Sequence, residues 1–143
     1  MNKPILCVDF DGVLHAYDSG WQGADVVADG PVVGAIPWLL AATQYFDVQI
    51  YSSRSSQPGG VEAMRNALCA WEQDHFNGMA PGCIVPLLSF PATKPAAFLT
   101  IDDRAVCFDG DFAALNPAEL AAFKPWNKRL PSPPSTEANR EGR

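Results

Sequence analysis

Short apolar stretches of strand character alternate along this chain with stretches of helical period, and this alternation limits the possible folds more than any other feature. The strand-like stretches lie at residues 4–10, 47–52, 83–88, 98–101 and 105–108. Helical spacing of apolar side chains covers residues 31–45 and 61–75. Strands separated by helices predict an α/β fold, a Rossmann-like parallel sheet with helices on both faces.

The length of the chain predicts one folded domain. It has 143 residues, and domains commonly hold about 100–200 residues. We expect residues 1–126 to form the domain, because all the strand-like and helical stretches lie within them. Residues 127–143 contain Pro131, Pro133 and Pro134 and are otherwise mostly polar. They are predicted to form a Pro-rich, disordered tail.

Several classes of protein are disfavoured by the composition. No apolar run approaches the ~20 residues that a membrane-spanning helix needs, so we expect no membrane partner. The start, Met1-Asn2-Lys3-Pro4, leads into a strand-like stretch without the apolar region of a secretory signal. The cysteines lack C-x-x-C spacing and lie in apolar stretches, at positions 7, 69, 83 and 107. Free thiols of this kind predict a reduced, cytoplasmic protein.

Charge is divided unevenly along the chain. Residues 124–143 carry five Lys or Arg and two Glu, a net of +3, while the whole chain has a net charge of -6, which leaves -9 on residues 1–123. An acidic body repels polyanions at long range. Nucleic acid is therefore a possible but not a favoured partner.

Polar side chains follow three of the expected strands. Asp9 and Asp11 follow the first, Asp102 and Asp103 follow the stretch 98–101, and the second is followed by Ser52, Ser53 and Arg54. Ligands of open α/β sheets bind beyond the carboxyl ends of the strands. Four acids at that edge would repel one another unless a cation neutralised them, and oxygen ligands without His or Cys suit Mg²⁺.

The same residue types are those that phosphoryl transfer uses. An Asp can attack phosphorus and form an aspartyl phosphate. A second acid, two residues later, can protonate the leaving oxygen and then deprotonate the attacking water. A hydroxyl and a positive charge stabilise the phosphoryl oxygens, and Ser52 and Lys94 are the candidates.

These motifs resemble those of the haloacid dehalogenase (HAD) superfamily of Mg²⁺-dependent phosphohydrolases. Asp9-Phe10-Asp11-Gly12-Val13-Leu14 is similar to the first motif of that family, Ile50-Tyr51-Ser52-Ser53-Arg54 to the second, Lys94 to the third, and Ile101-Asp102-Asp103-Arg104 to the fourth. The order and spacing of the motifs cover residues 5 to about 110. The resemblance implies a HAD-like fold and a phosphatase activity, because members that keep the second Asp are generally phosphatases or phosphomutases.

The resemblance also implies a role for each matching residue. Asp9 would be the nucleophile and a metal ligand, and Asp11 the general acid and base, which would bind metal through its backbone carbonyl. Asp102 and Asp103 would complete the metal site, one directly and the other directly or through water. Ser52 would hydrogen-bond the transferring phosphoryl group.

Further contacts follow from the same resemblance. Lys94 would neutralise the phosphoryl group and orient the nucleophile. Phe10, Ser53 and Arg54 are the expected substrate contacts, although a structural pairing of Arg54 with a nearby acid is an equal alternative.

We expect no substantial cap domain over this site. Only 17 residues separate Val13 from Pro31, and a helix and a strand are expected to use most of the 41 between Ser52 and Lys94. A small flap of His15, Tyr17 and Trp21 is expected at the entrance.

Three functions are consistent with these expectations. The first is a Mg²⁺-dependent hydrolase of phosphate monoesters, with a phosphorylated small molecule or a nucleotide as substrate. The second is a phosphatase that processes nucleotides or polynucleotide ends. The third belongs to another class, a binding protein that retains the fold and the metal site without turnover. The oligomeric state is not predicted.

Overall fold

The computed structural model of the chain describes residues 2–129. They divide into two compact units, Met1–Ala105 and Val106–Arg143. The first unit holds the sheet and the two long helices, and the second holds short helical turns, namely η2 (Phe112–Ala114), α3 (Pro117–Ala121) and η3 (Trp126–Lys128). The expected domain of residues 1–126 therefore includes parts of both units. The expected tail lies outside the described residues from position 130 onward.

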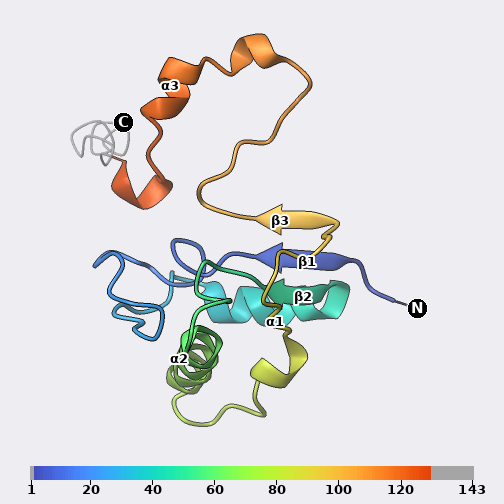
Figure 1. Cartoon of the computed structure of the whole chain (residues 1–143). Helices are drawn as coiled ribbons and strands as arrows, with labels where there is room; N and C mark the ends of the chain where they lie inside the picture. Colours follow the sequence, from blue (N-terminus) through green and yellow to red (C-terminus); the bar gives the residue numbers. More distant parts are fainter. Residues whose placement is uncertain (1, 130–143) are drawn as a thin grey trace, which may run out of the picture. The chain divides into compact units, whose positions relative to one another are not determined.

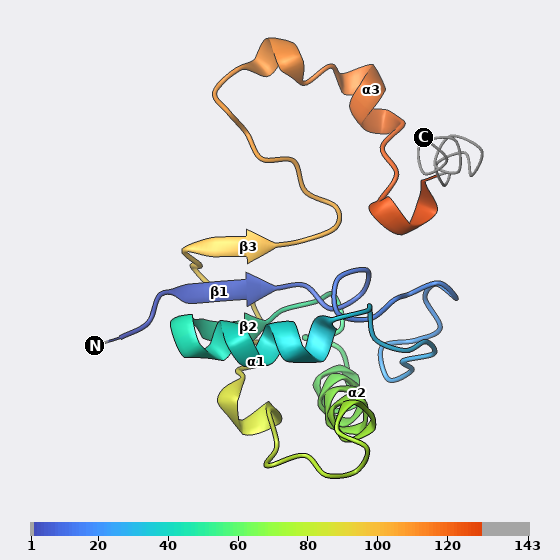
Figure 2. The same ribbon diagram turned by 180° about the vertical axis from the view of Figure 1, so that it is seen from behind.

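The sheet of the first unit is parallel, as the sequence predicts. Its strands are β1 (Ile5–Val8), β2 (Asp47–Ile50) and β3 (Leu99–Ile101), in the order β2-β1-β3. All three run in the same direction in Figures 1 and 2. In the register, Val8 lies opposite Ile50 on one side and Ile101 on the other. The α/β class is thus confirmed, as a small open sheet of three strands.

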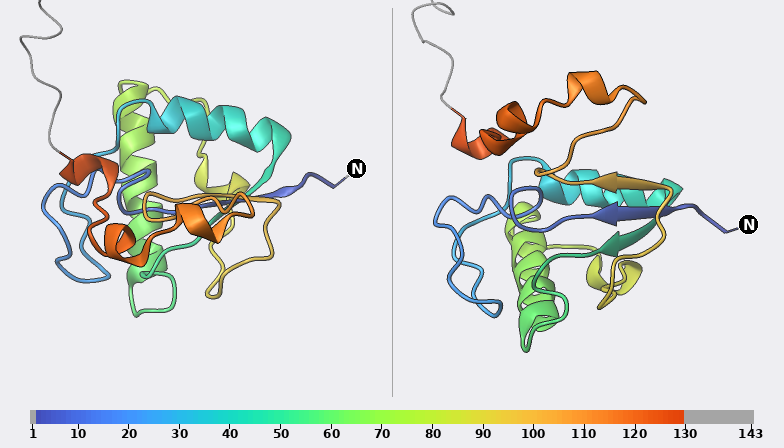
Figure 3. Two further views of the ribbon diagram at one scale, coloured as in Figure 1. Left: turned by 90° about the horizontal axis from the view of Figure 1, so that it is seen from above. Right: turned by 45° about the horizontal axis from the view of Figure 1, so that its top comes forward.

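Two helices accompany this sheet. α1 (Ala35–Tyr45) packs against β2 and against α2 (Gly60–His75), and Figure 3 shows α2 running across α1 rather than along it. The sequence pattern predicts a helix from residue 31, whereas α1 begins at Ala35. The cause is Gly34, whose positive φ of 87° interrupts helical geometry just before it.

The core lies between the sheet and the two helices. β1 and β2 contribute Leu6, Val8, Val48 and Ile50, and the helices contribute Ile36, Leu39, Met64, Leu68 and Trp71. The ring of Phe10 is also buried here and stacks on Trp71, with ring centroids 5.7 Å apart. The predicted apolar stripe of α2 is therefore buried at Met64, Leu68 and Trp71, whereas His75 at its end is exposed.

The strand predicted at residues 83–88 is wrong. This segment forms a 3-10 helix, η1 (Val85–Leu87), with Pro86 in its first turn. Proline has no N–H to donate to a neighbouring strand. Pairing with β2 is confined to Ser89, which donates to the Val48 carbonyl (3.1 Å) and accepts from the N–H of Ile50 (2.8 Å).

The strand predicted at residues 105–108 is also wrong. These residues have no regular structure, and the side chains of Val106 and Phe108 are half exposed. The described part of the second unit contains no strand with which they could pair, and an unpaired strand has no hydrogen-bond ladder to hold it.

An irregular loop covers the carboxyl end of the sheet. Residues 13–31 contain no helix and only isolated bridges, and they lie beyond the arrowheads of the strands in Figure 1, coloured blue. Between Val13 and Pro31, the first of the two stretches that could hold a cap domain, the chain forms only this loop.

No helix within residues 2–129 has the length and apolar character required to cross a bilayer.

Candidate active site

Three carboxylates meet at the carboxyl ends of β1 and β3. Asp9 directly follows β1 and its N–H donates to the Ile101 carbonyl (3.0 Å), so the strand register brings Asp9 beside Asp102. One carboxylate oxygen from each of Asp9, Asp102 and Asp103 lies within 4.8 Å of the other two. We call these residues the carboxylate cluster. Asp102 is exposed and the other two are partly buried.

The electrostatics of Asp9 show how unfavourable this arrangement is without a cation. Burial, a hydrogen bond with Asp103 and the charge of Asp102 together raise the pKa of Asp9 to about 8. The N–H of Phe10 donates to Asp9 Oδ1 (2.8 Å) and acts in the opposite direction. A bound cation would remove this repulsion, because it stabilises the ionised carboxylates.

The backbone beside the cluster is shaped around Asp103. Gly12 has a positive φ of 83°, and a Cβ at this position would collide with the Asp103 carboxylate. Glycine therefore leaves the space that lets Asp103 approach β1. All three potential metal ligands are carboxylate oxygens, and the site is partly open to solvent. The cluster therefore fits a hard divalent cation such as Mg²⁺.

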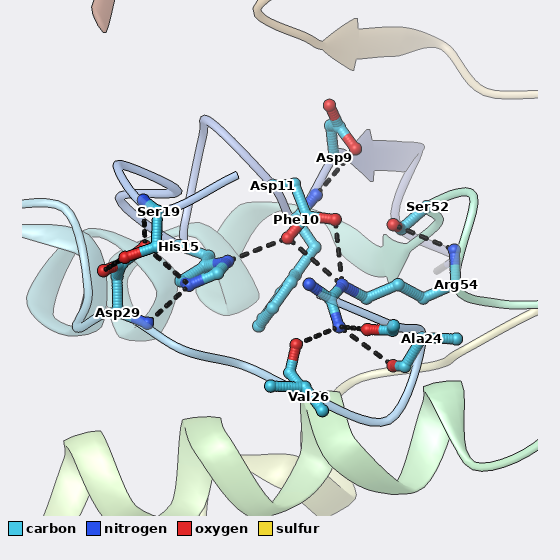
Figure 4. A network of polar contacts seen from close by, with 11 residues as sticks. Asp9, Phe10, Asp11, His15, Ser19, Ala24, Val26, Asp29, Ser52 and Arg54 are labelled. Carbon is cyan, nitrogen blue, oxygen red and sulfur yellow. Dashed lines mark hydrogen bonds and ion pairs between the residues drawn. The ribbon is translucent and has the colours of Figure 1, made fainter. Parts of the chain in front are cut away.

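Asp11 does not join the carboxylate cluster. Its carboxylate accepts two hydrogen bonds from Arg54 Nε, at 2.8 Å to Oδ2 and 3.1 Å to Oδ1, and Oδ1 also lies 2.8 Å from His15 Nδ1. Figure 4 shows the carboxylates of Asp9 and Asp11 turned away from each other. Asp11, the second acid of the motif, is thus held by the side chains of His15 and Arg54.

The partners of Asp11 keep it ionised. Burial disfavours its charged form, but the hydrogen bonds from His15 and Arg54 and the charge of Arg54 outweigh burial, so the pKa of Asp11 is lowered. Asp9 and Asp11, two positions apart, therefore have pKa values shifted in opposite directions. Such separation is typical of pairs of acids with different chemical tasks.

The tautomer of His15 follows from its two contacts. Nε2 accepts a hydrogen bond from the N–H of Asp29 (3.1 Å), so the proton of the neutral ring resides on Nδ1 and is donated to Asp11. The side chain is fully buried and lies between Phe10 and Tyr17, whose ring contacts it edge-on. His15 therefore connects Asp11 to the loop around residue 29.

Arg54 connects Asp11 to another part of that loop. Its side chain is fully buried, and Nη1 donates to three backbone carbonyls, those of Gly23, Ala24 and Val26. The guanidinium lies 5.0 Å from the ring of Trp21 and 5.8 Å from that of Phe10. Within residues 2–129, Nη2 has no hydrogen-bond partner, and these rings supply a partial substitute.

The expected flap of His15, Tyr17 and Trp21 does not form as one exposed group. His15 is part of the interior, whereas Trp21 is 46% exposed and covers Arg54. Arg54 has no exposed surface, so this structure favours the alternative of structural pairing over direct contact with a substrate.

The remaining expected site residues lie at different depths. Ser52 is buried, and its Oγ accepts a hydrogen bond from the N–H of Arg54 (3.2 Å). The backbone N–H of Ser52 donates to Ser55 Oγ (2.9 Å). This turn leaves the Ser52 hydroxyl proton available for donation. Ser53 is exposed, and the ring of Phe10 is in the core, so only its backbone reaches the site.

Lys94 is exposed and stands apart from the carboxylates. No ion pair within 4.0 Å joins it to an acid in the described part of the chain. Burial raises the pKa of Cys7, while the charge of Lys94 acts to lower it and those of Asp9 and Asp102 act to raise it. Lys94 is therefore close enough to β1 for its charge to act on Cys7.

Two features of the site were not predicted from the sequence. One is the contact of His15 with Asp11, for which the spacing of four residues around Gly12 offers a weak signal. The other is Asp29, whose carboxylate accepts from the N–H (2.8 Å) and hydroxyl (2.7 Å) of Ser19 and fixes the loop that meets His15. No spacing in the sequence indicates this second contact.

Comparison with known proteins adds no assignment. No family model, no curated protein and no solved structure matches this chain.

Proposed function

We propose that the chain is a Mg²⁺-dependent hydrolase of phosphate monoesters, with a HAD-like fold whose helices cover both faces of the sheet. The observation that supports this most is the carboxylate cluster, in which Asp9, Asp102 and Asp103 bring oxygens within 4.8 Å of one another at the carboxyl edge of a parallel sheet. An acidic group of this kind, next to a second acid with a different pKa, suits phosphoryl transfer.

In the first step, a carboxylate oxygen of Asp9 attacks phosphorus and the bond to the ester oxygen breaks. The product is an aspartyl phosphate on Asp9, and the leaving oxygen takes a proton from Asp11. Asp11 must first take up this proton from solvent, because His15 and Arg54 favour its ionised form. The hydrogen bond from Phe10 N–H fixes the orientation of the Asp9 carboxylate through Oδ1. The Ser52 hydroxyl and Lys94 would bind the phosphoryl oxygens.

In the second step, water attacks the phosphorus of the aspartyl phosphate and Asp11 accepts its proton. Inorganic phosphate leaves and the Asp9 carboxylate is restored. His15 and Arg54 hold Asp11 and lower its pKa, so they favour its charged form, which is the form that accepts this proton. Both are positioning residues in this scheme.

Asp9, Asp102 and Asp103 would hold Mg²⁺, together with the backbone carbonyl of Asp11. When bound, the ion offsets the negative charge of the carboxylates and of the phosphoryl group. The substrate is proposed to be a phosphorylated small molecule or a nucleotide, because residues 1–123 carry a net charge of -9. We also propose a cytoplasmic location, because the four cysteines are free thiols in this structure.

A panel of phosphate monoesters tests the proposal. It comprises p-nitrophenyl phosphate, nucleoside monophosphates and oligonucleotides phosphorylated at either end, each assayed with Mg²⁺ and with EDTA. Turnover is expected only with Mg²⁺, and Asp9→Asn should lower it by a factor of about 10³ or more. Glu62→Gln, which removes an exposed acid from α2, is the matched control and should retain the activity.

Beryllofluoride distinguishes the non-catalytic alternative. The wild-type protein should bind this phosphoryl analogue in the presence of Mg²⁺, and Asp9→Asn should not. A folded wild-type protein that neither hydrolyses any member of the panel nor binds beryllofluoride would refute the enzyme and favour a binding protein.

A further inference from the structure

Two cysteines approach each other on the side of α2 that faces η1. Cys69 lies in the second half of α2 and is partly buried, and Cys83 lies just before η1 and is exposed. Their sulfur atoms are 3.9 Å apart and share a hydrogen bond. Within residues 2–129, the interactions of this pair are with each other and with Glu72, which is not part of the proposed catalytic site.

A neighbouring contact keeps the two thiols together. Glu72 lies one turn after Cys69 on the same face of α2, and its buried carboxylate accepts a hydrogen bond from the N–H of Ile84 (2.9 Å). Ile84 itself is buried in the core. Since Cys83 directly precedes Ile84, this anchor holds its backbone against the turn of α2 that carries Cys69.

The segment between the two cysteines can adjust. Asn77 and Gly78 have positive φ values of 55° and 79° and turn the chain back after α2. Gly82, next to Cys83, has open space around it, with no atom within 4 Å of the position of a Cβ. A disulfide needs the sulfurs at about 2.05 Å, and rotation of the side chains with a small shift at Gly82 can provide this approach.

We propose that Cys69 and Cys83 form a reversible disulfide when the protein meets a low-molecular-weight disulfide such as glutathione disulfide. The exposed Cys83 attacks the oxidant, forming a mixed disulfide and releasing one glutathione thiol. Cys69 then attacks the sulfur of Cys83 and releases the second glutathione thiol. The two protein thiols are thereby oxidised, and one molecule of glutathione disulfide is reduced to two thiols that carry the two protons.

The order of these events follows from the exposure of the two sulfurs. Cys83 is open to solvent, whereas Cys69 is partly covered, and its hydrogen bond with Cys83 raises the pKa of the Cys69 thiol. The remaining thiols are placed less well for this reaction. Cys7 is buried in β1, and Cys107 belongs to the second unit.

Oxidation should stabilise the first unit. The disulfide would close a loop of about 15 residues and restrict the unfolded chain, which predicts a rise in Tm of about 5–10 °C. The rise should disappear on addition of dithiothreitol. It should be absent from Cys69→Ser and Cys83→Ser and present in Cys107→Ser, the matched control that removes an exposed cysteine outside the pair.

Thiol counting and peptide mass measurement test the linkage itself in the wild-type full chain. The reduced protein has four thiols. After treatment with glutathione disulfide, Cys69 and Cys83 should have lost theirs without carrying glutathione and Cys7 should keep its thiol, while the exposed Cys107 can carry a glutathione of its own. Trypsin should release residues 66–104 as one peptide, because Pro95 protects Lys94 from cleavage. This peptide contains both Cys69 and Cys83 and should be lighter by two hydrogen atoms.

Two results would overturn the proposal. One is retention of all four thiols after the treatment. The other is glutathione that remains on Cys83, or a crosslink through Cys107, while Cys69 still reacts with an alkylating agent. Both are read from the wild-type protein, so they do not depend on whether a variant folds, and neither depends on phosphatase activity.

Discussion

Arg54 Nε lies 2.8 Å from Asp11 Oδ2, and this ion pair joins the loop after β1 to the loop after β2. The Arg54 side chain is fully buried and that of Asp11 is 12% exposed. The same guanidinium holds the carbonyls of the loop at residues 23–26. One buried side chain therefore sets both the direction of Asp11 and the position of the loop that covers the sheet edge.

Replacement of Arg54 should destabilise the protein strongly. Arg54→Ala leaves the partly buried carboxylate of Asp11 without its positively charged partner and removes the donor to three backbone carbonyls, so we expect a loss of about 3–5 kcal/mol in the free energy of unfolding. Urea denaturation measures this loss. Arg65→Ala removes only a stacking contact with Phe90 (5.1 Å) and should cost about 1 kcal/mol or less. Equal losses in the two variants would contradict a structural role for Arg54.

Replacement of Gly12 should impair the proposed cation site specifically. Gly12→Ala forces a residue with a side chain into a positive φ of 83° and displaces the Asp103 carboxylate. The variant should lose about 1–2 kcal/mol of stability and bind Mg²⁺ about tenfold more weakly. Gly20→Ala meets the same backbone strain, at φ 75°, with no neighbour within 4 Å, and should keep its Mg²⁺ affinity. Isothermal titration calorimetry measures the Mg²⁺ affinity of both variants. Equal affinities would show that Gly12 does not shape the proposed cation site.

Replacement of His15 should change the titration of Asp11. His15→Phe keeps a buried ring but removes the hydrogen bond that lowers the pKa of Asp11, so that pKa should rise. Loss of the acceptor for the Asp29 N–H should cost about 1–3 kcal/mol of stability. Carboxyl carbon NMR follows the titration directly. Tyr17→Phe leaves both hydrogen bonds of His15 intact, and a pKa of Asp11 that is equal in the two variants would disprove the assigned contact.

The stability of the metal-free protein should fall as pH rises from about 4 to about 8. Burial and the neighbouring acids raise the pKa of Asp9 from 3.8 to about 8, so the folded state keeps a proton that the unfolded state releases. The stability that this proton provides is fully present below pH 3.8 and is lost as the pH passes through about 8. The lowered pKa of Asp11 acts in the opposite sense, but its contribution changes only below 3.8.

Denaturation in EDTA at about pH 5 and about pH 9 measures this effect. Asp9→Asn cannot ionise and should show a smaller decrease between the two pH values than the wild-type protein does. Mg²⁺ should also reduce the decrease, since it stabilises the ionised form. A wild-type protein as stable at the higher pH as at the lower one would show that Asp9 ionises freely.

The sequence by itself determined that the strands are parallel and that acidic residues lie together at the carboxyl edge of the sheet. Asp9 and Asp102 each follow a strand directly, and neighbouring parallel strands end side by side, so local pattern and topology suffice to bring them together. The same local reasoning failed at residues 83–88. There the apolar run resembles a strand, but Pro86 cannot donate to β2 and a 3-10 turn forms instead.

Only the tertiary structure decided the surroundings of Asp11. Its carboxylate depends on Arg54, 43 residues away, and on His15, whose ring is held by Asp29. The orientations of the Asp11 carboxylate and the His15 ring are set by hydrogen bonds between loops. Such bonds can form between any loops that packing brings together. Spacing along the chain gives no signal for the contacts of Arg54 and Asp29 and only a weak one for that of His15. The position of a residue at the end of a strand, in contrast, depends on its immediate neighbours in the sequence.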